Sequence, residues 1–561
     1  MAPRKRIRES FLSVATLVLA LIWVPAATAA VVPVTVTNDV TQHVRSGFLG
    51  LSFEIRGMAG YTGNDPKAVN PVFEQLIRNI DPDQQPVLRL GGDTGDWTWY
   101  PVPGMKRPLG VRYSLSANWL AVMKSLARTL DARMIMAVNL EVNSTRVADA
   151  EARAFISGIG SPWLEALQLG NEPELYNVLA WYAVDNKPVY GRPANWNQAQ
   201  FLSNYASTVR SMPDYALAGP EVGSPPWVAG IGQFLDREPR VKIVTVHRYA
   251  LGCDLSPPAT ISDLLSDSAT RDSASGLGPA LSAAHTHGDQ IRLDEANTVT
   301  CGGQQGLSNT FAAALWDLDV SFEVAQRGFN GINFHTREGI PNQLFTFSES
   351  HHVWSGDVEP DYYGLLAFAH AAPAGSAILG TTGPTSGPLH VWATRAPNGL
   401  EHAVLINMAQ KSGRTVALRG NTDTDDVTVE RLTAPSAGAT AGVEFDGQSF
   451  ASGTHTGLLA GRTHTITIKR SGHGSFSVWV PPASAAIVDL GAARGRAASA
   501  VHRSFCQAFG LHDTCHIDHS RCARLVQNPA GSAPAQSVAT GSRQHRGLAH
   551  ARRVACSVWR I

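Results

Sequence analysis

Short apolar runs alternate with longer amphipathic stretches between about residue 46 and residue 345. The runs have the length of buried strands and the stretches between them have helical spacing, which is the pattern of a repeated βα unit. Eight strands are predicted, at 48–54, 87–92, 134–140, 165–172, 215–221, 242–249, 291–297 and 331–335. This pattern predicts an α/β fold in which residues 46–345 close into a (β/α)8 TIM barrel.

The stretch before the last of these strands shows the helical pattern most clearly. Its apolar residues at 311, 315, 318, 322 and 325 fall on one face. Ser308 is suited to cap the start of this helix and Gly328 to end it. We therefore expect a helix with one face packed on the barrel wall.

Beyond residue 345 the helical pattern fades and short alternating strands recur between turn residues, as in "LHVWAT", "HAVLINM" and "FSVWV". This pattern predicts a C-terminal β-sandwich over residues 346–493. The segment 31–45 begins with the alternating run "VVPVTVTNDV". We expect this run to add an N-terminal strand to the sandwich.

The two ends of the chain differ from the body. Basic residues between 4 and 8 precede "FLSVATLVLALIWV" and the small-residue stretch "PAATAA", so residues 1–30 are predicted to be a secretory signal peptide cleaved after Ala29 or Ala30. A membrane anchor is disfavoured because the run is short, and no membrane span is predicted after signal removal. The mature protein is expected to be secreted and extracellular.

The tail 494–561 has ten Arg, no Lys, six His and four Cys, with little periodicity. This composition predicts a disordered segment. A zinc site at Cys515, His516, His519 and Cys522 is the alternative, but their spacing matches no common zinc pattern, and no metal is predicted. The whole chain balances 46 basic against 46 acidic residues, so it lacks the basic surplus typical of a nucleic-acid partner.

Polar residues follow the predicted barrel strands at the points where the apolar runs stop. In a TIM barrel the active site lies at these C-terminal strand ends. The residues are Glu54, Asp93, Asn139, Glu141, Asn171, Glu172, His247, Tyr249, Glu295, Asn297, His335 and Arg337. For most single positions, polar cover of the barrel mouth is the better explanation of the residue.

Glu172 and Glu295 stand out because they end the fourth and seventh predicted strands, which face each other across a barrel mouth. A carboxylate pair is what glycoside hydrolysis requires. One carboxyl group protonates the leaving oxygen, and the other either attacks the anomeric carbon or activates a water. The expected separation for a retaining enzyme is about 5–5.5 Å.

The blocks "LQLGNEPELY" and "IRLDEANTVTCGG…LSNTFAAALWDLDVSFEVAQRGFNGINFH" resemble the two catalytic blocks of glycoside hydrolase family 79, the β-glucuronidase and heparanase family. The resemblance extends over roughly residues 31–490. It implies a retaining double displacement with Glu172 as acid/base, Glu295 as nucleophile and Asn171 holding the sugar 2-hydroxyl. It also implies a carbohydrate substrate, which is an oligosaccharide or a glycoconjugate, and no cofactor.

One departure from the family pattern affects the expected substrate. Thr300 stands where several family members carry a tyrosine that holds the uronic carboxylate. The N–H groups of Gly302 and Gly303, with His335 or Arg337, are the alternative groups for a carboxylate. A β-glucoside, β-xyloside or arabinoside substrate therefore stays open.

A non-catalytic glycan-binding protein that stacks sugars on Trp97 and Trp99 is the alternative from another functional class. The presence of both carboxylates argues against it.

Two cysteines of the barrel segment follow neighbouring strands. Cys253 comes shortly after the sixth predicted strand and Cys301 shortly after the seventh, both in glycine-flanked loops. Neighbouring parallel strands place such loop starts side by side. An exported protein meets oxidising conditions, so we predict a Cys253–Cys301 disulfide.

Overall fold

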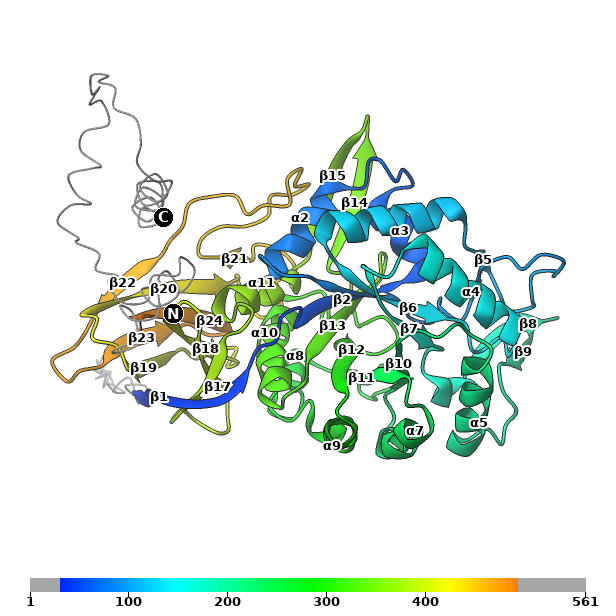
Figure 1. Cartoon of the computed structure of the whole chain (residues 1–561). Helices are drawn as coiled ribbons and strands as arrows, with labels where there is room; N and C mark the ends of the chain where they lie inside the picture. The colour runs from blue at the N-terminus through cyan, green and yellow to red at the C-terminus, as the bar shows by residue number, and fades with distance from the viewer. Residues whose placement is uncertain (1–30, 493–561) are drawn as a thin grey trace, which may run out of the picture. The chain divides into compact units, whose positions relative to one another are not determined.

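Eight parallel strands form a closed barrel in the computed structural model, which describes residues 31–492 (Figure 1). Each overlaps one of the eight strands predicted from the sequence, and the TIM barrel is confirmed. In barrel order the strands are β2 (Leu49–Glu54), β3 (Val87–Gly91), β6 (Arg133–Val138), β7 (Leu164–Leu169), β10 (Leu217–Val222), β11 (Val241–Leu251), β12 (Gln290–Val299) and β13 (Gly331–Thr336).

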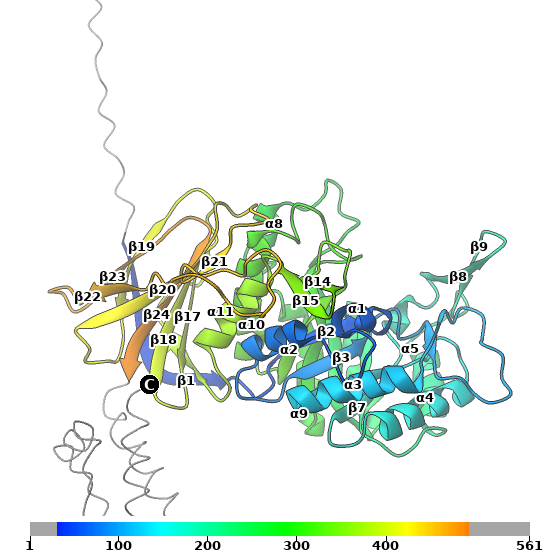
Figure 2. The ribbon, with the colours of Figure 1, turned by 90° about the horizontal axis from the view of Figure 1, so that it is seen from above.

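Helices cover the outside of the barrel, as the view from above shows for α2, α3 and α4 (Figure 2). Local signals set several of their ends: Asn70 caps α2 by accepting hydrogen bonds from two backbone N–H groups, and Pro71 begins the helix. The helices are α1 (Met58–Thr62), α2 (Pro71–Ile80), α3 (Ala117–Leu130), α4 (Thr145–Gly158), α5 (Gln198–Val209), α6 (Pro225–Ala229), α7 (Ile231–Arg237), α8 (Ile261–Leu264), α9 (Gly278–His287), α10 (Phe311–Gln326) and α11 (Tyr362–Ala371).

Helix α10 differs from its prediction in two respects. Its N-cap is Thr310, whereas the Ser308 hydroxyl accepts hydrogen bonds from Thr298 and from the Gln304 N–H. Every residue from Phe311 to Ala325 is buried, so the helix has no solvent-exposed face. The helix contacts the C-terminal β domain as well as the barrel, since Asp319 of α10 accepts hydrogen bonds from β-domain side chains.

The first segment beyond the barrel strands also differs from its expected assignment. A hairpin of β14 (Phe345–Ser350) and β15 (Val353–Val358) precedes α11, and α11 packs against α10 and α2. Helix α11 therefore takes the place of the helix between β13 and β2, and the barrel unit extends beyond the expected boundary at residue 345. The first strand of the β domain after it is β16.

The C-terminal β domain is built from two sheets that share strand β1 (Val32–His43). This strand pairs with β19 in parallel through its first residues and with β16 in antiparallel through its later ones. Apolar side chains from both sheets, among them Val34, Leu405, Val416, Phe476 and Val488, form one core. The other strands are β16 (Ala377–Thr381), β17 (Leu389–Arg395), β18 (Leu400–Asn407), β19 (Arg414–Arg419), β20 (Asp426–Thr433), β21 (Glu444–Phe445), β22 (Ile466–Lys469), β23 (Phe476–Val480) and β24 (Ser484–Ala492).

Side-chain hydrogen bonds link α10 to the β domain. Asp319 accepts from Trp392 Nε1 at 2.7 Å, and its second oxygen lies 2.8 Å from His390 Nδ1.

The loops after β3 and β7 each contain a short strand pair. These pairs are β4 (Thr98–Trp99) with β5 (Tyr113–Ser114), and β8 (Ala180–Val184) with β9 (Lys187–Tyr190).

The predicted signal peptide at 1–30 and the predicted disordered tail at 494–561 lie outside the described residues. Within residues 31–492, no helix combines the length and the apolar character needed to cross a membrane.

Candidate active site

Two carboxylates, Glu172 and Glu295, lie together at the C-terminal mouth of the barrel. Glu172 follows β7 and Glu295 lies within β12. One oxygen of each, together with one nitrogen of His247, all lie within 4.8 Å of one another. This separation is far below the roughly 6.5–9.5 Å of inverting glycosidases, in which a water must fit between the two carboxyl groups.

Glu295 is buried and surrounded by donors and cations. Tyr249 donates its hydroxyl hydrogen to Oε1 at 2.8 Å, and the Arg89 guanidinium donates to Oε2. Burial alone would raise the pKa of Glu295, but the charges of His335, His247 and Arg89 and the Tyr249 hydrogen bond hold that pKa well below its usual range. Glu295 is therefore an ionised carboxylate at neutral pH, as a nucleophile must be.

Glu172 is held differently, in a strained turn and with access to solvent. Its φ of 44° is in the left-handed region, and its N–H donates to the Glu221 carbonyl at 3.0 Å. Its Oε1 lies 3.0 Å from His247 Nδ1, and the side chain is 23% exposed. One carboxylate is thus enclosed among cations while the other faces the cleft.

Arg89, on β3, is a site residue that the sequence patterns did not reveal. The side chain is fully buried and all five of its N–H groups have acceptors. These acceptors are Glu295 Oε2, Glu221 Oε2 at 2.8 Å, Asn171 Oδ1 at 2.7 Å, Gln168 Oε1 at 3.0 Å and Ser52 Oγ at 3.1 Å. One guanidinium thus fixes side chains from β2, β7, β10 and β12. The only sequence signal is a charged residue inside the apolar run "VLRLGG".

Glu221 and Asp294 form a second buried acidic layer behind the carboxylate pair, and both were missed by the sequence analysis. His247 Nε2 lies 3.1 Å from Glu221 Oε2 and 3.7 Å from Asp294 Oδ1. Burial raises the pKa of Glu221, but the nearby Arg89 and His247 outweigh this effect and lower it to about 2. For Asp294, burial and the Glu221 charge raise the pKa well above its usual range. The layer therefore holds one ionised and one protonated carboxyl group.

Local irregularities in two strands bring these acids inward. The pairing of β11 with β12 advances from Val246–Leu293 to His247–Glu295, so Asp294 is an extra residue on β12. A similar shift between Pro220 and Val222 makes Glu221 extra on β10, where its φ is 66°. Such bulges break the two-residue alternation, which allows the consecutive Asp294 and Glu295 both to approach Arg89.

His335 and Glu54 close the other side of the site. His335 Nδ1 lies 2.9 Å from Ser52 Oγ and 3.7 Å from Glu295 Oε2, and Nε2 lies 3.7 Å from Glu54 Oε1. Thr94 donates two hydrogen bonds to Glu54 Oε2. Burial opposes the charged forms of both residues. The Glu295 charge and the interaction with Glu54 nevertheless raise the pKa of His335, and His335 and Thr94 lower that of Glu54.

Asp93 and Asn171 lie on the open side of the pair. Asn171 Nδ2 donates to Asp93 Oδ1 at 3.1 Å. Desolvation among the surrounding groups and the charges of Glu54, Glu172 and Glu295 raise the pKa of Asp93 to about 7. Because the Asp93 side chain is exposed to the cleft, it is available to a ligand.

Two predicted binding residues serve the fold instead. The Asn297 amide donates to the His335 carbonyl at 2.8 Å and its oxygen accepts from the Thr298 N–H, so its polar atoms connect β12 to β13. The Gly303 N–H donates to the Thr300 carbonyl at 3.2 Å within a turn, and is not free for a substrate carboxylate. Sequence position alone could not distinguish these hydrogen bonds from ligand contacts.

The other groups expected to recognise a carboxylate have fewer partners. Gly302 has a φ of 87°, and none of the described backbone or side-chain groups accepts from its N–H. Arg337 follows β13, is half-buried, and forms no ion pair or hydrogen bond within residues 31–492. The Thr300 hydroxyl accepts from the Cys253 N–H at 2.8 Å, so this side chain supports the loop.

A pocket of about 100 Å³ lies on the Glu172 side of the mouth. Its lining includes Glu172 and Asn171 but not Glu295, and its apolar part comes from Leu175, Leu179, Trp97 and Trp181. The loops after β3, β6 and β7 supply these residues.

The expected stacking platform of Trp97 and Trp99 does not form. Trp99 is buried and donates its Nε1–H to Ser114 Oγ at 2.8 Å. The Trp97 ring is covered by the Arg112 guanidinium, 3.8 Å from the ring centroid. The two rings therefore cannot bind a sugar together.

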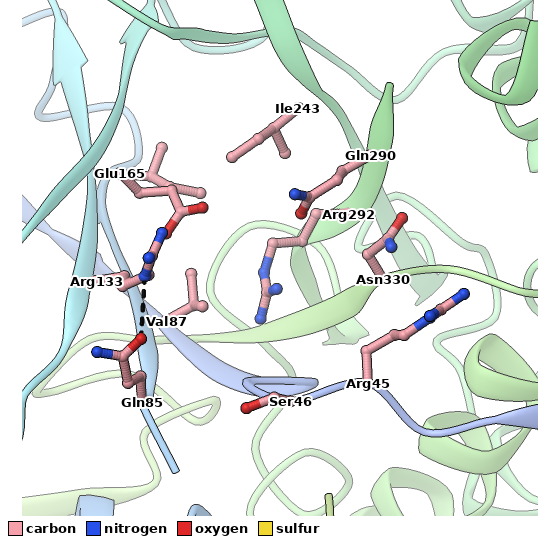
Figure 3. A pocket seen from close by; sticks show the side chains of 11 residues that line it. Arg45, Ser46, Gln85, Val87, Arg133, Glu165, Ile243, Gln290, Arg292 and Asn330 are labelled. Atoms are coloured by element: carbon pink, nitrogen blue, oxygen red, sulfur yellow. Dashed lines mark hydrogen bonds and ion pairs between the residues drawn. The ribbon is translucent and has the colours of Figure 1, made fainter. Parts of the chain in front are cut away.

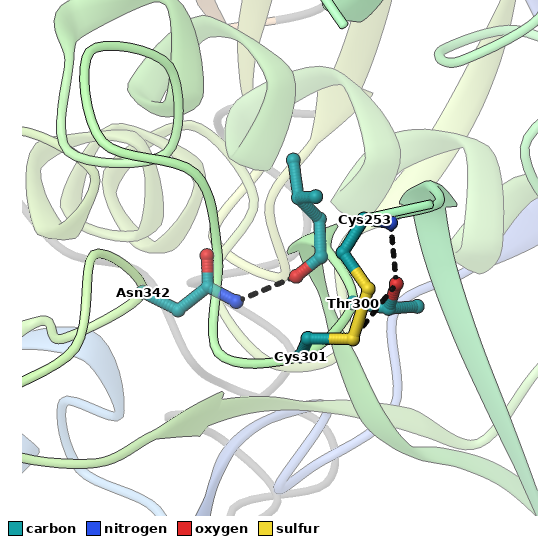
Figure 4. The surroundings of a disulfide bond; sticks show 5 residues. Cys253, Thr300, Cys301 and Asn342 are labelled. Atoms are coloured by element: carbon teal, nitrogen blue, oxygen red, sulfur yellow. Dashed lines mark hydrogen bonds between the residues drawn. A yellow bond between two sulfur atoms is a disulfide. The ribbon is translucent and has the colours of Figure 1, made fainter. Parts of the chain in front are cut away.

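Cys253 and Cys301 form the predicted disulfide, which joins the loops after β11 and β12 (Figure 4). Their Cα atoms are 6.0 Å apart. The Asn342 amide donates to the Val299 carbonyl at 2.9 Å just before the bridge. The bridge therefore constrains the loop that carries Gly302.

Two sets of side chains at this site have the composition of metal ligands, Glu172–His247–Glu295 and Glu221–His247–Asp294. In both sets His247 already contacts the carboxylates. Burial lowers the pKa of His247, but the surrounding carboxylates raise it well above its usual range. The imidazolium and Arg89 thus compensate the negative charges that a cation would otherwise balance.

Comparisons with known proteins agree with this architecture. Residues 391–487 match the model of the glycosyl hydrolase family 79 C-terminal beta domain. A β-glucuronidase from Aspergillus niger is 23% identical over 522 residues, covering 82% of this chain and 93% of that protein. A β-glucuronidase from Neurospora crassa is 24% identical over 366 residues, and the match spans 58% of this chain and only 63% of that protein.

Solved structures share the fold. A 4-O-α-L-rhamnosyl-β-D-glucuronidase from Fusarium oxysporum has a TM-score of 0.65 at 20% identity, covering 82% of this chain and 99% of its own. The family 51 arabinofuranosidase from Xanthomonas axonopodis has a TM-score of 0.55 at 14% identity, with coverage of 82% and 100%.

Proposed function

Because this chain is a glycoside hydrolase of family 79, we propose that it is an exported β-glucuronidase that hydrolyses its substrate with retention of anomeric configuration. The observation that carries the retaining mechanism is the placement of one oxygen each of Glu172 and Glu295 within 4.8 Å. The two curated relatives are both β-glucuronidases, which supports the choice of sugar.

In the first step, Glu295 attacks the anomeric carbon while Glu172 donates its proton to the leaving oxygen. The bond from the anomeric carbon to the leaving oxygen breaks as the glycosyl ester to Glu295 forms. In the second step, Glu172 removes a proton from water, the water oxygen bonds to the anomeric carbon, and the Glu295 carboxylate leaves. The cations that keep Glu295 ionised also make it a good leaving group, because they stabilise the carboxylate.

The two sides of the site have different roles in this proposal. The sugar lies between the carboxylates, where Asp93 and Asn171 meet its hydroxyls. The pocket that contains Glu172 but not Glu295 receives the leaving group. Its lining of Leu175, Leu179 and two tryptophans suits an apolar or aromatic aglycone.

The uronic carboxylate is proposed to bind Arg337 and the Gly302 N–H, because both lie at the same barrel mouth and neither has a partner within the described residues. An ionised donor roughly doubles the strength of a hydrogen bond to a carboxylate. This pair takes over the role that a tyrosine at position 300 would have had.

A panel of p-nitrophenyl glycosides tests the sugar. We expect kcat/KM for the β-D-glucuronide to exceed that for the β-D-glucoside, β-D-xyloside and α-L-arabinofuranoside by at least ~100-fold, because unpaired polar groups penalise a substrate that lacks the carboxylate. Arg337→Gln should lower kcat/KM for the glucuronide and leave any glucosidase activity unchanged. Faster cleavage of a neutral glycoside would contradict the proposal.

Export is proposed from residues 1–30 and agrees with the disulfide. N-terminal sequencing of the protein from culture medium should give a first residue of Ala30 or Val31. A product that stays inside the cell with Met1 intact would contradict export.

A further inference from the structure

A second cavity, of about 390 Å³, opens at the N-terminal end of the barrel, opposite the carboxylate pair. Figure 3 shows the side chains that line it. The first residues of β3, β6 and β12 and the segments that precede β2 and β13 line it. The lining residues are Arg45, Ser46, Gln85, Val87, Arg133, Ile135, Glu165, Ile243, Gln290, Arg292 and Asn330.

An apolar layer separates this cavity from the active site. Val87, Ile135, Ala166, Ala218 and Ile243 form a cluster of their own inside the barrel. Three of these side chains also line the cavity. A ligand in the cavity therefore cannot contact the two glutamates, and the cavity is a separate site.

Arg292 is the central group of the cavity. It is only 5% exposed, and Figure 3 shows its guanidinium pointing into the space between Arg133 and Arg45. Its Nε donates to Asn333 and its Nη2 to the Gly47 and Phe48 carbonyls, but none of the described residues accepts from Nη1. The buried Arg292 cation thus has three uncharged acceptors, and its Nη1 has no acceptor among the described residues.

No carboxylate within the described residues forms an ion pair with Arg292. Burial lowers its pKa to about 10, so the group is still charged at neutral pH. Asp81 exerts the largest attraction, but burial raises the pKa of Asp81 well above its usual range and favours its neutral form. Asp81, Glu165 and Asp294 attract Arg292 from beyond ion-pair distance. A buried cation with no carboxylate in direct contact favours an external anion.

The rest of the lining offers mainly donors. The Asn330 oxygen already accepts from the Ile291 N–H at 2.9 Å, which leaves its NH₂ group for a ligand. Arg133 uses Nη1 for Glu165 and Nε for Gln85, which leaves Nη2. Arg45 lies exposed at the rim with no ion pair among the described residues. Three arginines against one glutamate give the lining a net charge of 3 − 1 = +2.

We propose that this cavity is a binding site for a tetrahedral oxyanion, with Arg292 and the Asn330 amide at its base and Arg133 and Arg45 at its entrance. The oxyanion is either a free sulfate or phosphate ion or the sulfate ester of a sugar. The second source is possible because the cavity is larger than one such anion and has room for a sugar. Both sources present the same oxygen atoms to the same donors.

Isothermal titration of the full-length protein tests the site, with sodium sulfate, sodium phosphate and galactose 6-sulfate as probes at matched ionic strength in sodium chloride. The key variant is Asn330→Asp, which keeps the acceptor for the Ile291 N–H and replaces the donor toward the cavity with a negative charge. Arg45→Gln removes a rim cation that forms no hydrogen bond or ion pair through its side chain within residues 31–492. Gln305→Glu, at an exposed position outside the cavity, is the matched control for added charge.

Saturable sulfate binding is expected in the parent and in Gln305→Glu, with Kd raised about tenfold or more in Asn330→Asp and severalfold in Arg45→Gln. Tighter binding of galactose 6-sulfate than of sulfate would identify a sulfated carbohydrate as the source, and the reverse order would identify the free ion. No saturable binding of any probe to the parent, or equal Kd values for the parent and Asn330→Asp, would overturn the proposal. Circular dichroism verifies that each variant is folded.

Discussion

Replacing Arg89 with methionine removes the cation at the centre of the active site while keeping a side chain of similar length. In the parent, Arg89 donates to Glu221 Oε2 at 2.8 Å and to Glu295 Oε2, and none of these groups is more than 8% exposed. The variant therefore leaves Glu221 without its main counter-charge and Glu295 without one of the three cations that surround it. His247 is the cation that still contacts Glu221.

The size of the effect can be estimated in two ways. Removing one partner of a buried ion pair costs about 3–5 kcal/mol. Glu221 also has a pKa of about 2 in place of the usual 4.5. This difference corresponds to about 3 kcal/mol of folding free energy, which Arg89 supplies together with His247 against the effect of burial. We therefore expect Arg89→Met to lower the free energy of unfolding by about 3–5 kcal/mol at neutral pH.

The sign of the pH dependence follows from the same values. A depressed carboxyl pKa contributes stability that is present above the unfolded pKa of 4.5 and is lost as the pH falls toward the folded pKa of about 2. In the variant, burial is no longer opposed by Arg89, so the pKa of Glu221 rises. The difference in stability between parent and variant should therefore shrink as the pH is lowered from neutral through about 4.5.

Urea unfolding followed by circular dichroism at neutral pH and at about pH 3 measures both quantities. Arg153→Met is the control, since Arg153 is exposed and pairs with Asp149 one helical turn away, and it should have little effect at either pH. A loss below about 1 kcal/mol for Arg89→Met at neutral pH, or a loss that does not diminish in acid, would refute the reasoning.

Three further predictions concern the carboxylates and their loops. Tyr249→Phe should lower kcat about tenfold and move the acidic limb of the pH profile upward, because Glu295 loses a hydrogen bond that lowers its pKa; an unchanged acidic limb would contradict this. Cys301→Ser should lower the free energy of unfolding by about 2–4 kcal/mol and raise KM, and a parent with two titratable thiols at Cys253 and Cys301 would exclude the bridge. Glu172→Ala should lose kcat on poor leaving groups but retain much of it on dinitrophenyl glycosides, which need no proton; equal losses on both would reverse the assignment.

The fold was largely predictable because the barrel strands are continuous apolar runs and the β-domain strands alternate. Both patterns reflect which side chains are buried, and the spacing of apolar residues in a single sequence shows this. The surroundings of helix α10 were not predictable, because its burial on all sides depends on β-domain residues such as Trp392 that are distant in sequence. The extent of the barrel was misjudged for the same reason, since α11 lies on the barrel through contacts with α2.

For the site, the strand-end rule located the two glutamates, and family resemblance assigned their expected roles. The residues behind them were missed for a physical reason: a bulge in β12 places Asp294, and a second bulge in β10 places Glu221, inside the barrel against the two-residue period. Arg89 occupies a position where an apolar residue would be expected, and only its five acceptors explain it. Asn297 shows the opposite error, because a polar residue at a strand end can be used entirely by the backbone.

The stereochemistry of hydrolysis tests the central claim most directly. Proton NMR during rapid cleavage of a β-glucuronide shows the anomer that forms before mutarotation. Because one oxygen each of Glu172 and Glu295 lies within 4.8 Å, the β anomer should appear first and the α anomer should grow only later. An α anomer formed first would contradict the double displacement and the roles assigned to both glutamates.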